Sequence, residues 1–323
     1  MRFRYDSMRG RCLHFARSIV ERSVRAKQGR DAIIRAMLSR RFLLIASAAL
    51  GAATCGRGLQ AQQRRSLADP LRLGVDTALF DGGLARALQQ GFGRDTGIAV
   101  LLVRSPATSL LEALDRGEVD AALCNTPDAE ARLDQLGLVH DRQMVARGEF
   151  VIVGPSSPGP AHGAAPGAAR GPAGDPAHIA GMRDAAMALQ RLRDAALADP
   201  ATPYFLSAAD GSGVHVAEQA LWRAARIAPA APWYAAAAPG SGLLAQARAR
   251  PAYALVERGA WIAQGGSPLA VLVEGDPALA EAVHVMRSFR VSHPAGKIFV
   301  SWITGPKGRS VVAKSRGYRP PSP

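Results

Sequence analysis

The sequence predicts an α/β protein in which strands alternate with helices around a mostly parallel sheet. Three observations support this fold class. Short apolar runs alternate with helix-length segments whose apolar residues recur every three or four positions. The 323 residues suffice for about two domains, each with its own core. A hydrophobic content of 48% with 20% charged residues excludes wholesale disorder.

The first half of the chain contains four expected strands and two expected helices. In the first helix, Leu84, Leu88 and Phe92 lie four residues apart and form one apolar face. The elements are, in order, strand Leu71–Val75, helix Gly82–Asp95, strand Ile98–Arg104, helix Ser105–Arg116, strand Val119–Leu123 and strand Phe150–Val153.

A segment rich in Pro, Gly, Ala and Ser, Pro155–Pro176, separates the two halves and is typical of a surface loop or linker. Trp233 and Tyr234 are expected to pack in a core or between lobes. The later elements are helix Ile179–Leu197, strand Tyr204–Ser207, a helix from Ser212 to about Ala225, a Gly-rich turn at Pro239–Gly242 with a helix to Arg248, strand Ala252–Val256, an apolar run at Leu269–Val273 and a helix near Gly296–Ile303.

Positive charge is concentrated before the first strand. Residues 1–41 hold twelve Arg or Lys against three acidic residues and so carry +9 of the formal +14. The uncharged run Phe42–Ala53 is too short for a bilayer span, which needs about 20 residues, and is typical of a secretory signal. We expect residues 1–61 to be a leader with a signal peptide whose functional start is Met37, and a periplasmic mature protein. Met1–Ala36 is either an extended leader or the result of a misassigned start.

The export route of the leader and the way it is processed each have two interpretations. Ser39–Leu43 resembles a twin-arginine export signal, but two arginines also suit an ordinary Sec signal. Cys55 is a candidate for lipid attachment, although Thr54 before it makes a poor lipobox. The alternative is cleavage of the signal peptide after Ala61. Because Arg57 leaves as well, cleavage there gives a mature charge of +4. That charge does not favour nucleic acid as a partner.

Three strand-to-helix turns have the chemistry of a small-ligand site. Ligands in open α/β sheets bind at the carboxyl ends of strands, where helix N-termini offer free amides. The alternative is local: a hydroxyl caps its helix, Asp210 anchors its turn, and Arg104 is a solvated strand end. The turns are Val75–Gly83, Arg104–Ser109 and Ser207–His215, and the candidate ligand-binding residues are Thr77, Arg104, Thr108, Ser109, Asp210, Ser212 and Gly213.

The third of these turns carries a family resemblance. Residues 207–222, SAADGSGVHVAEQALW, are similar to the Ser-Arg-Gly-Asp-x-Ser-Gly-Thr-His segment of tungstate-binding periplasmic proteins, the solute receptors of tungstate ABC importers. Further matches follow the family's order from about Leu71 to Gly308: LLEALDRGEVDAALCNTP, EFVIVGP, APWYAAAAPGSGLLAQA, YALVERGAW and VLVEGDP. The resemblance implies a type II periplasmic-binding-protein fold, in which two α/β lobes joined by crossover strands surround a ligand cleft.

The resemblance also implies a domain organisation and partners. The crossovers would be Phe150–Pro155 and Val271–Pro277. Lobe one would comprise residues 70–153 plus 276–323, and lobe two residues 154–275. The lobes of a monomer would close on a small anion, tungstate or molybdate in the family, and present it to an ABC permease. We expect no cofactor, no metal and no nucleic acid. We expect contact with the membrane only through the transporter or a lipid anchor.

The pocket residues depart from the family. Its first loop reads Thr-Thr-Thr-Ser, whereas Val75–Ala78 retains only Thr77 and introduces an acid. The family's binding arginine aligns with Ala208, and its threonine before the histidine aligns with Val214. One lost charged contact weakens binding by roughly 1.5–3 kcal/mol, on the order of ten- to a hundredfold. We therefore expect weak or absent tungstate binding, with Arg104 as a candidate replacement cation.

The sequence gives weaker support to other classes of function. The sequence has no nucleophile elbow, zinc-protease, P-loop or dinucleotide-binding motif, so no enzymatic activity is expected. Ser212 and His215 are three residues apart without the context of a catalytic serine. Cys124, the one cysteine left after cleavage at Ala61, suits a core position, with a catalytic thiol as the alternative. A ligand-sensing or interaction protein on the same scaffold is the alternative function.

Overall fold

A computed structural model describes residues 63–155, 174–199, 204–240, 242–265 and 268–322. The leader expected at residues 1–61, with its start at Met37 and the lipidation candidate Cys55, lies outside the described residues. Most of the loop expected at Pro155–Pro176 does too. The described residues belong to one compact unit, Gln60–Pro323. Among them, no helix has the length and apolar character needed to cross a membrane.

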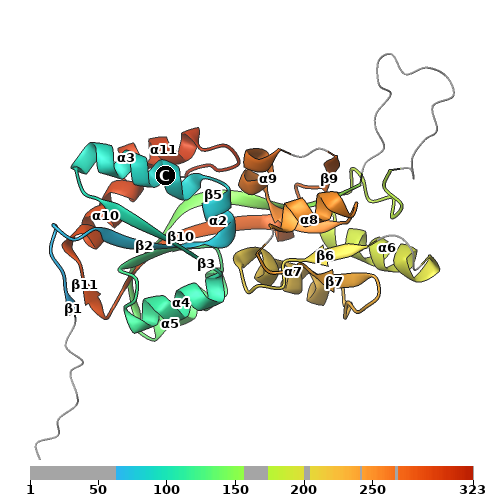
Figure 1. Cartoon of the computed structure of the whole chain (residues 1–323), viewed down its shortest axis with the longest axis horizontal. Coiled ribbons are helices and arrows are strands. Elements are labelled where there is room, and N and C mark those ends of the chain that lie inside the picture. Colours follow the sequence, from blue (N-terminus) through green and yellow to red (C-terminus); the bar gives the residue numbers. More distant parts are fainter. Residues whose placement is uncertain (1–62, 156–173, 200–203, 241, 266–267, 323) are drawn as a thin grey trace, which may run out of the picture. The chain divides into compact units, whose positions relative to one another are not determined.

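Three parallel strands begin the main sheet. β2 (Leu71–Asp76) lies between β3 (Val100–Ser105) and β4 (Ala121–Cys124) and pairs with both in parallel. Helices α3, α10 and α11 lie on one face, and α4 and α5 on the other (Figure 1). Their ranges, with that of the short helix α2, are α2 (Thr77–Asp81), α3 (Leu84–Thr96), α4 (Ala107–Arg116), α5 (Pro127–Gln135), α10 (Pro294–Thr304) and α11 (Pro306–Lys314).

The 17-residue strand β5 (Val139–Pro155) connects the two lobes. Its first part pairs with β10 (Ala280–Ser288), and its last part pairs with β8 (Ala254–Glu257) and β9 (Leu269–Val273), all antiparallel. β10 also pairs with β4, so the strand order is β3-β2-β4-β10-β5-β8, with β9 on β5. A 3₁₀ turn, Pro277–Leu279, leads into β10. β5 and the β9-to-β10 connection thus cross between the lobes (Figure 1).

Lobe two is built on the far end of β5. Its parallel strands β6 (Phe205–Ser207) and β7 (Tyr234–Ala236) join the sheet at Tyr253, just before β8. The Leu206 amide donates to the Tyr253 carbonyl at 2.8 Å. The helices of this lobe are α6 (Ala185–Ala198), α7 (Gly213–Ala224), α8 (Leu243–Ala249) and α9 (Arg258–Gln264).

Each lobe has its own hydrophobic core. In lobe one, Phe92 of α3 packs edge-on against Phe299 of α10, with ring centroids 5.1 Å apart. In lobe two, Phe205 and Trp222 pack in the same way at 5.1 Å. Trp233 is 6% exposed and belongs to this second core. The two cores are distinct clusters, although Ala78 of α2 packs with the second.

The sheet is mixed rather than mostly parallel, which corrects the sequence-based expectation. Every pairing of β5 and β10 in the described residues is antiparallel, because β5 and the connection into β10 pass between the lobes rather than form βαβ units. Phe150–Val153 is only the end of β5, while β10, α5, α9 and α11 were not predicted at all. α6 begins at Ala185, after its cap Asp184, rather than at Ile179.

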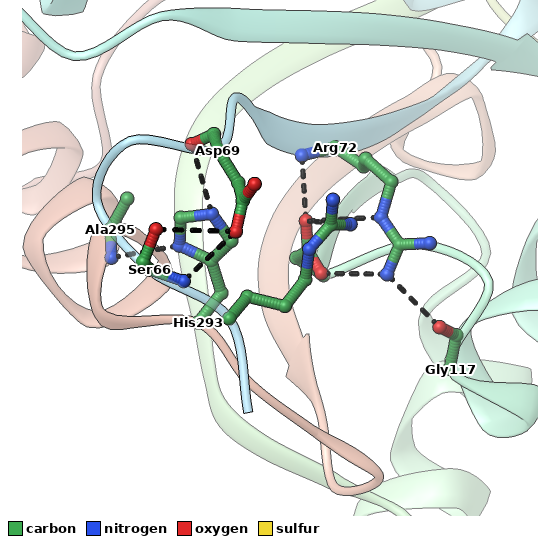
Figure 2. Close-up of polar contacts among 8 residues, drawn as sticks. Ser66, Asp69, Arg72, Gly117, His293 and Ala295 are labelled. Carbon is green, nitrogen blue, oxygen red and sulfur yellow. Dashed lines mark hydrogen bonds and ion pairs between the residues drawn. The ribbon is translucent and has the colours of Figure 1, made fainter. Parts of the chain in front are cut away.

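The start of the described chain is bonded to lobe one (Figure 2). β1 (Gln63–Arg64) pairs in parallel with β11 (Val291–Ser292), and His293 Nε2 lies 3.2 Å from the Asp69 carbonyl oxygen. Further along, the Arg72 guanidinium donates to both carboxylate oxygens of Asp120 (2.8 and 3.2 Å) and to the Gly117 carbonyl. Asp120 is buried, so these bonds compensate for its desolvation.

Replacing Asp120 by Asn should therefore destabilise the fold. The variant leaves the Arg72 guanidinium without its charged partner, and we expect a loss of about 2–3 kcal/mol in unfolding free energy. Thermal denaturation measures it, at about 2–4 °C per kcal/mol for a domain of this size. The control is Asp194→Asn, which removes a mostly exposed carboxylate beside Arg193 and should leave the melting temperature unchanged. Equal melting temperatures for the two variants would contradict a stabilising role for the bond between Arg72 and Asp120.

Candidate functional site

A cavity of about 380 Å³ lies where the two lobes meet. Its volume falls in the range of small-molecule pockets. Much of its wall is apolar, from residues such as Val214, Leu243 and Val256. The polar lining residues are Thr77, Asp81, Arg104, Asp210, Ser212, Glu257 and Gln264. Most of these lie just after the carboxyl end of a strand, where α/β proteins bind their ligands.

Two short turns position the polar residues. Asp76 ends β2 and caps α2, with its Oδ1 accepting from the Ala78 amide at 3.0 Å. Ser212 caps α7, with its Oγ accepting from the His215 amide at 3.4 Å. In the same turn, Asp210 Oδ1 accepts from the Ser212 amide at 2.9 Å. These side-chain bonds satisfy amides that a helix start otherwise leaves unpaired.

The turn before α7 also touches lobe one. The Thr108 amide donates to the Gly211 carbonyl at 3.1 Å, and the Gly213 amide donates to Asp76 Oδ2 at 3.1 Å. Gly213 packs against Asn125, so that a Cβ at position 213 would come within 1.9 Å of the Asn125 Oδ1. Only glycine fits at this contact, which brings the start of α7 against the ends of β2 and β4.

The seven residues singled out in the sequence have different surroundings. Thr77, Arg104, Asp210 and Ser212 line the cavity together. Thr108 and Ser109 are exposed and do not line it. Gly213 is buried, and its amide is bonded to Asp76.

Arg104 is the one cationic side chain among the described lining residues. Its guanidinium is held in a two-point ion pair with Asp81, at 2.8 and 3.0 Å, and lies over the Phe80 ring. Asp81 raises the pKa of Arg104 further, so the cation is permanent. An incoming anion must therefore compete with Asp81 for Arg104.

The Thr77 hydroxyl is available for a ligand. Thr77 begins α2, and its Oγ1 is a buried atom with no hydrogen-bond partner in the structure. Buried polar atoms are nearly always paired in folded proteins. A ligand in the adjoining cavity would supply the missing partner.

Three buried acids, Asp76, Glu257 and Glu281, lie in and behind the cavity wall. Burial raises the pKa of Asp76 to about 6, although the Gly213 and Ala78 amides oppose the shift. Burial raises the pKa of Glu257 to about 7, against the amides of α9 that it caps. Burial, with the nearby Glu257 carboxylate, raises the pKa of Glu281 well above its usual value. The cavity is thus surrounded by more acidic than basic groups.

The sequence did not identify Asp81 or Glu257 as site residues. Glu257 directly follows the predicted strand Ala252–Val256, so the same strand-end argument that selected Thr77 would have found it. Asp81 lies one helical turn beyond Thr77, and nothing local indicates its pairing with Arg104.

The geometry does not assemble a catalytic serine. Ser212 Oγ accepts from the His215 backbone, and His215 Nδ1 accepts from the Gly211 amide at 3.1 Å. The Cys124 thiol is fully buried, and this burial raises its pKa well above the ordinary value, which disfavours the reactive thiolate. In the described residues, no group of three or more His, Cys, Asp or Glu is arranged to hold a metal ion.

Comparisons with known proteins point to solute receptors. No protein-family model matches the chain. A Haloferax volcanii protein that carries the name of an ABC transporter anion-binding protein is 27% identical over 255 residues, 75% of this chain and 68% of that protein. The tungstate-binding protein TupA of Peptoclostridium acidaminophilum is 25% identical over 251 residues, 75% of this chain and 80% of its own. The solved tungstate ABC transporter structure from Geobacter sulfurreducens is 26% identical, with a TM-score of 0.61 over 76% of this chain and 98% of that chain.

The raised pKa of Glu257 predicts a pH-dependent effect of Glu257→Gln. In the unfolded chain this acid ionises near 4.5 and in the folded chain near 7, so its ionisation lowers the wild-type stability as pH rises through that window. Glu281 and Tyr318 lie beside it and carry no positive charge to offset this. The melting temperature of Glu257→Gln minus that of wild type should therefore rise between pH 5 and pH 7.5, by roughly 5 °C.

A matched control is Glu118→Gln. Glu118 is exposed, and its bond to Arg116 lowers its pKa, so its difference curve should not rise over the same range. A flat curve for Glu257→Gln would show that Glu257 is not held in its neutral form by burial.

Proposed function

We propose that this chain, a divergent relative of the tungstate-type solute-binding proteins of ABC transporters, captures a small anion between its lobes and delivers it to a membrane permease. The cavity between the lobes supports this most directly, because it combines an arginine, a free buried hydroxyl and strand ends from both lobes. The names of the two relatives, an anion-binding protein and a tungstate-binding protein, support the same class of solute.

The proposed mechanism is lobe closure. Lobe one comprises residues 70–153 plus 276–323 and lobe two residues 154–275, so β5 and the β9-to-β10 connection serve as the hinge. In the open state, solute reaches Arg104 and Thr77 on lobe one. Closure then brings Asp210 and Ser212 of lobe two against it and removes it from water. The ligand-contact residues in this proposal are therefore Thr77, Arg104, Asp210 and Ser212.

The charge of the cavity favours a solute with a single negative charge. Arg104 is already paired with Asp81, and Asp210 faces the same space, so a compact dianion meets more repulsion than attraction. Ala208, at the position where the family resemblance implies an arginine, lines the wall and supplies no charge. A monoanionic group attached to an organic body would displace Asp81 and fill the apolar part of the cavity.

We further propose that the mature protein is periplasmic. The signal peptide inferred at residues 37–61 supports export by the Sec or twin-arginine route, with a lipid anchor at Cys55 as the alternative. The described fold begins at Gln63, shortly after the inferred cleavage position, so removal of the leader would spare every described element.

Anion binding at Arg104 is testable by thermal shift and calorimetry on residues 62–323. The panel comprises tungstate, molybdate, sulfate, phosphate and organic monocarboxylates. We expect at least one monoanion to raise the melting temperature, and tungstate to bind far more weakly than nanomolar. Arg104→Ala should weaken the monoanion at least tenfold, because it removes the only cation among the described lining residues.

The matched control is Arg193→Ala, which removes a partly exposed arginine of α6 away from the cavity and should leave binding unchanged. Nanomolar tungstate binding would overturn the proposed change of solute. No response to any anion would favour the sensing or interaction alternative over transport.

A further inference from the structure

Asp76 makes a contact that a helix cap does not require. Its Oδ1 accepts from the Ala78 amide in its own helix α2, as any N-cap does. Its Oδ2 accepts from the Gly213 amide at the first turn of α7, 137 residues away and in the other lobe. Asp76 is 0% exposed, so both bonds form inside the contact between the lobes.

The groups around the carboxylate are those that bind free anions elsewhere. Backbone amides at the first turn of a helix, together with the helix dipole, form a ready-made anion site. One such amide, that of Gly213 in the first turn of the twelve-residue helix α7, donates to Asp76. Asn125 packs against Gly213 and is 4% exposed; its Nδ2 donates to Glu281 rather than to Asp76. The Asp76 carboxylate is the negative group that these surroundings hold.

We propose that Asp76 is a built-in substitute for an anionic ligand: its carboxylate links α2 to α7, holds the lobes together without solute and bars oxyanions from the same amides. The inference rests on the proposed function in taking the cavity beside Asp76 as the solute site. It makes Asp76 a specificity-determining residue, because the amide that would attract a second anion is already bonded.

A second acidic side chain of the protein, Asp81, also occupies a group that could bind an anion. Arg104, the cation among the described lining residues, is bonded to Asp81, just as the Gly213 amide is bonded to Asp76. Asp81 is partly exposed and can be displaced, whereas Asp76 is fully buried and cannot swing away without opening the lobes. Solute thus competes for Arg104, while the start of α7 stays closed to it.

The raised pKa of Asp76, about 6, is consistent with this arrangement but leaves the carboxylate ionised at pH 7.5 to 8. The charges near Asp76 are Asp210 and Arg104, with Glu281 and Glu257 behind it. Experiments at pH 8 therefore test the ionised Asp76 carboxylate in its link between α2 and α7.

The test compares Asp76→Ser with wild type, both spanning residues 62–323. Serine still caps α2 but is too short to reach α7, so it separates the cap from the bridge. Without solute, we expect the Gly213 amide to exchange with solvent about tenfold faster by NMR, and the radius of gyration to rise in X-ray scattering. Calorimetry should show sulfate, molybdate or tungstate binding at least tenfold more tightly than to wild type.

Asp184→Ser is the matched control. Asp184 is exposed and caps α6 through the Met187 amide at 2.8 Å, outside the contact between α2 and α7, so its loss should change neither amide exchange at Gly213 nor oxyanion affinity. Asp76→Asn serves as the second variant if the serine variant does not fold, because it keeps the shape and removes the charge.

The outcomes separate this inference from the proposed function. A folded Asp76 variant with wild-type amide exchange, wild-type scattering and no gained oxyanion affinity overturns the role of Asp76, even where wild type binds a monoanion through Arg104. Oxyanion binding gained by the variant supports that role, even where wild type binds nothing in the panel and the proposed function fails.

Discussion

The continuity of β5 is the constraint on which the rest of the structure depends. One strand pairs with β10 in lobe one and with β8 and β9 in lobe two, so the parts of the sheet in the two lobes cannot slide relative to each other. At Gly148, opposite Glu281, a Cβ would come within 2.2 Å of the Glu281 carboxylate, so the crossing is tightly packed. The ends of β2, β3, β6 and β8 therefore converge on one cavity, and their polar residues meet although they lie far apart in the chain.

The buried acidic side chains around the cavity are stabilised by amide groups rather than by cationic side chains. Asp76 and Glu257 each bond two amides at helix starts, and Glu281 accepts from the Asn125 side chain at 2.6 Å. Amides carry only partial charge, so burial still raises the pKa of all three acids. The region behind the cavity consequently holds protons more readily than isolated carboxylates would, and its charge is set by the packing of the two lobes.

The sequence predicts the elements whose pattern is local and misses those that depend on distant partners. The helix with Leu84, Leu88 and Phe92, and the strands Leu71–Val75 and Tyr204–Ser207, show a clear period and lie where they were expected. β10 carries Glu281 and His284 on buried positions, so its alternation looks polar until the Asn125 and Glu130 side chains that contact them are known. Likewise, the sequence shows the acid at Asp76 but not its bond to the Gly213 amide, because Gly213 lies 137 residues away.

The bonds from Thr108 to Gly211 and from Gly213 to Asp76 join the lobes through protein atoms alone. If solute enters through molecules in which these bonds are broken, the observed dissociation constant equals the intrinsic one divided by the open fraction. An open fraction of roughly one in a hundred weakens apparent affinity about a hundredfold without altering a single contact in the pocket. At high solute concentration, the speed of capture then reaches a plateau set by how often the molecule opens. Such a receptor would be tuned to abundant solutes rather than to scavenging traces.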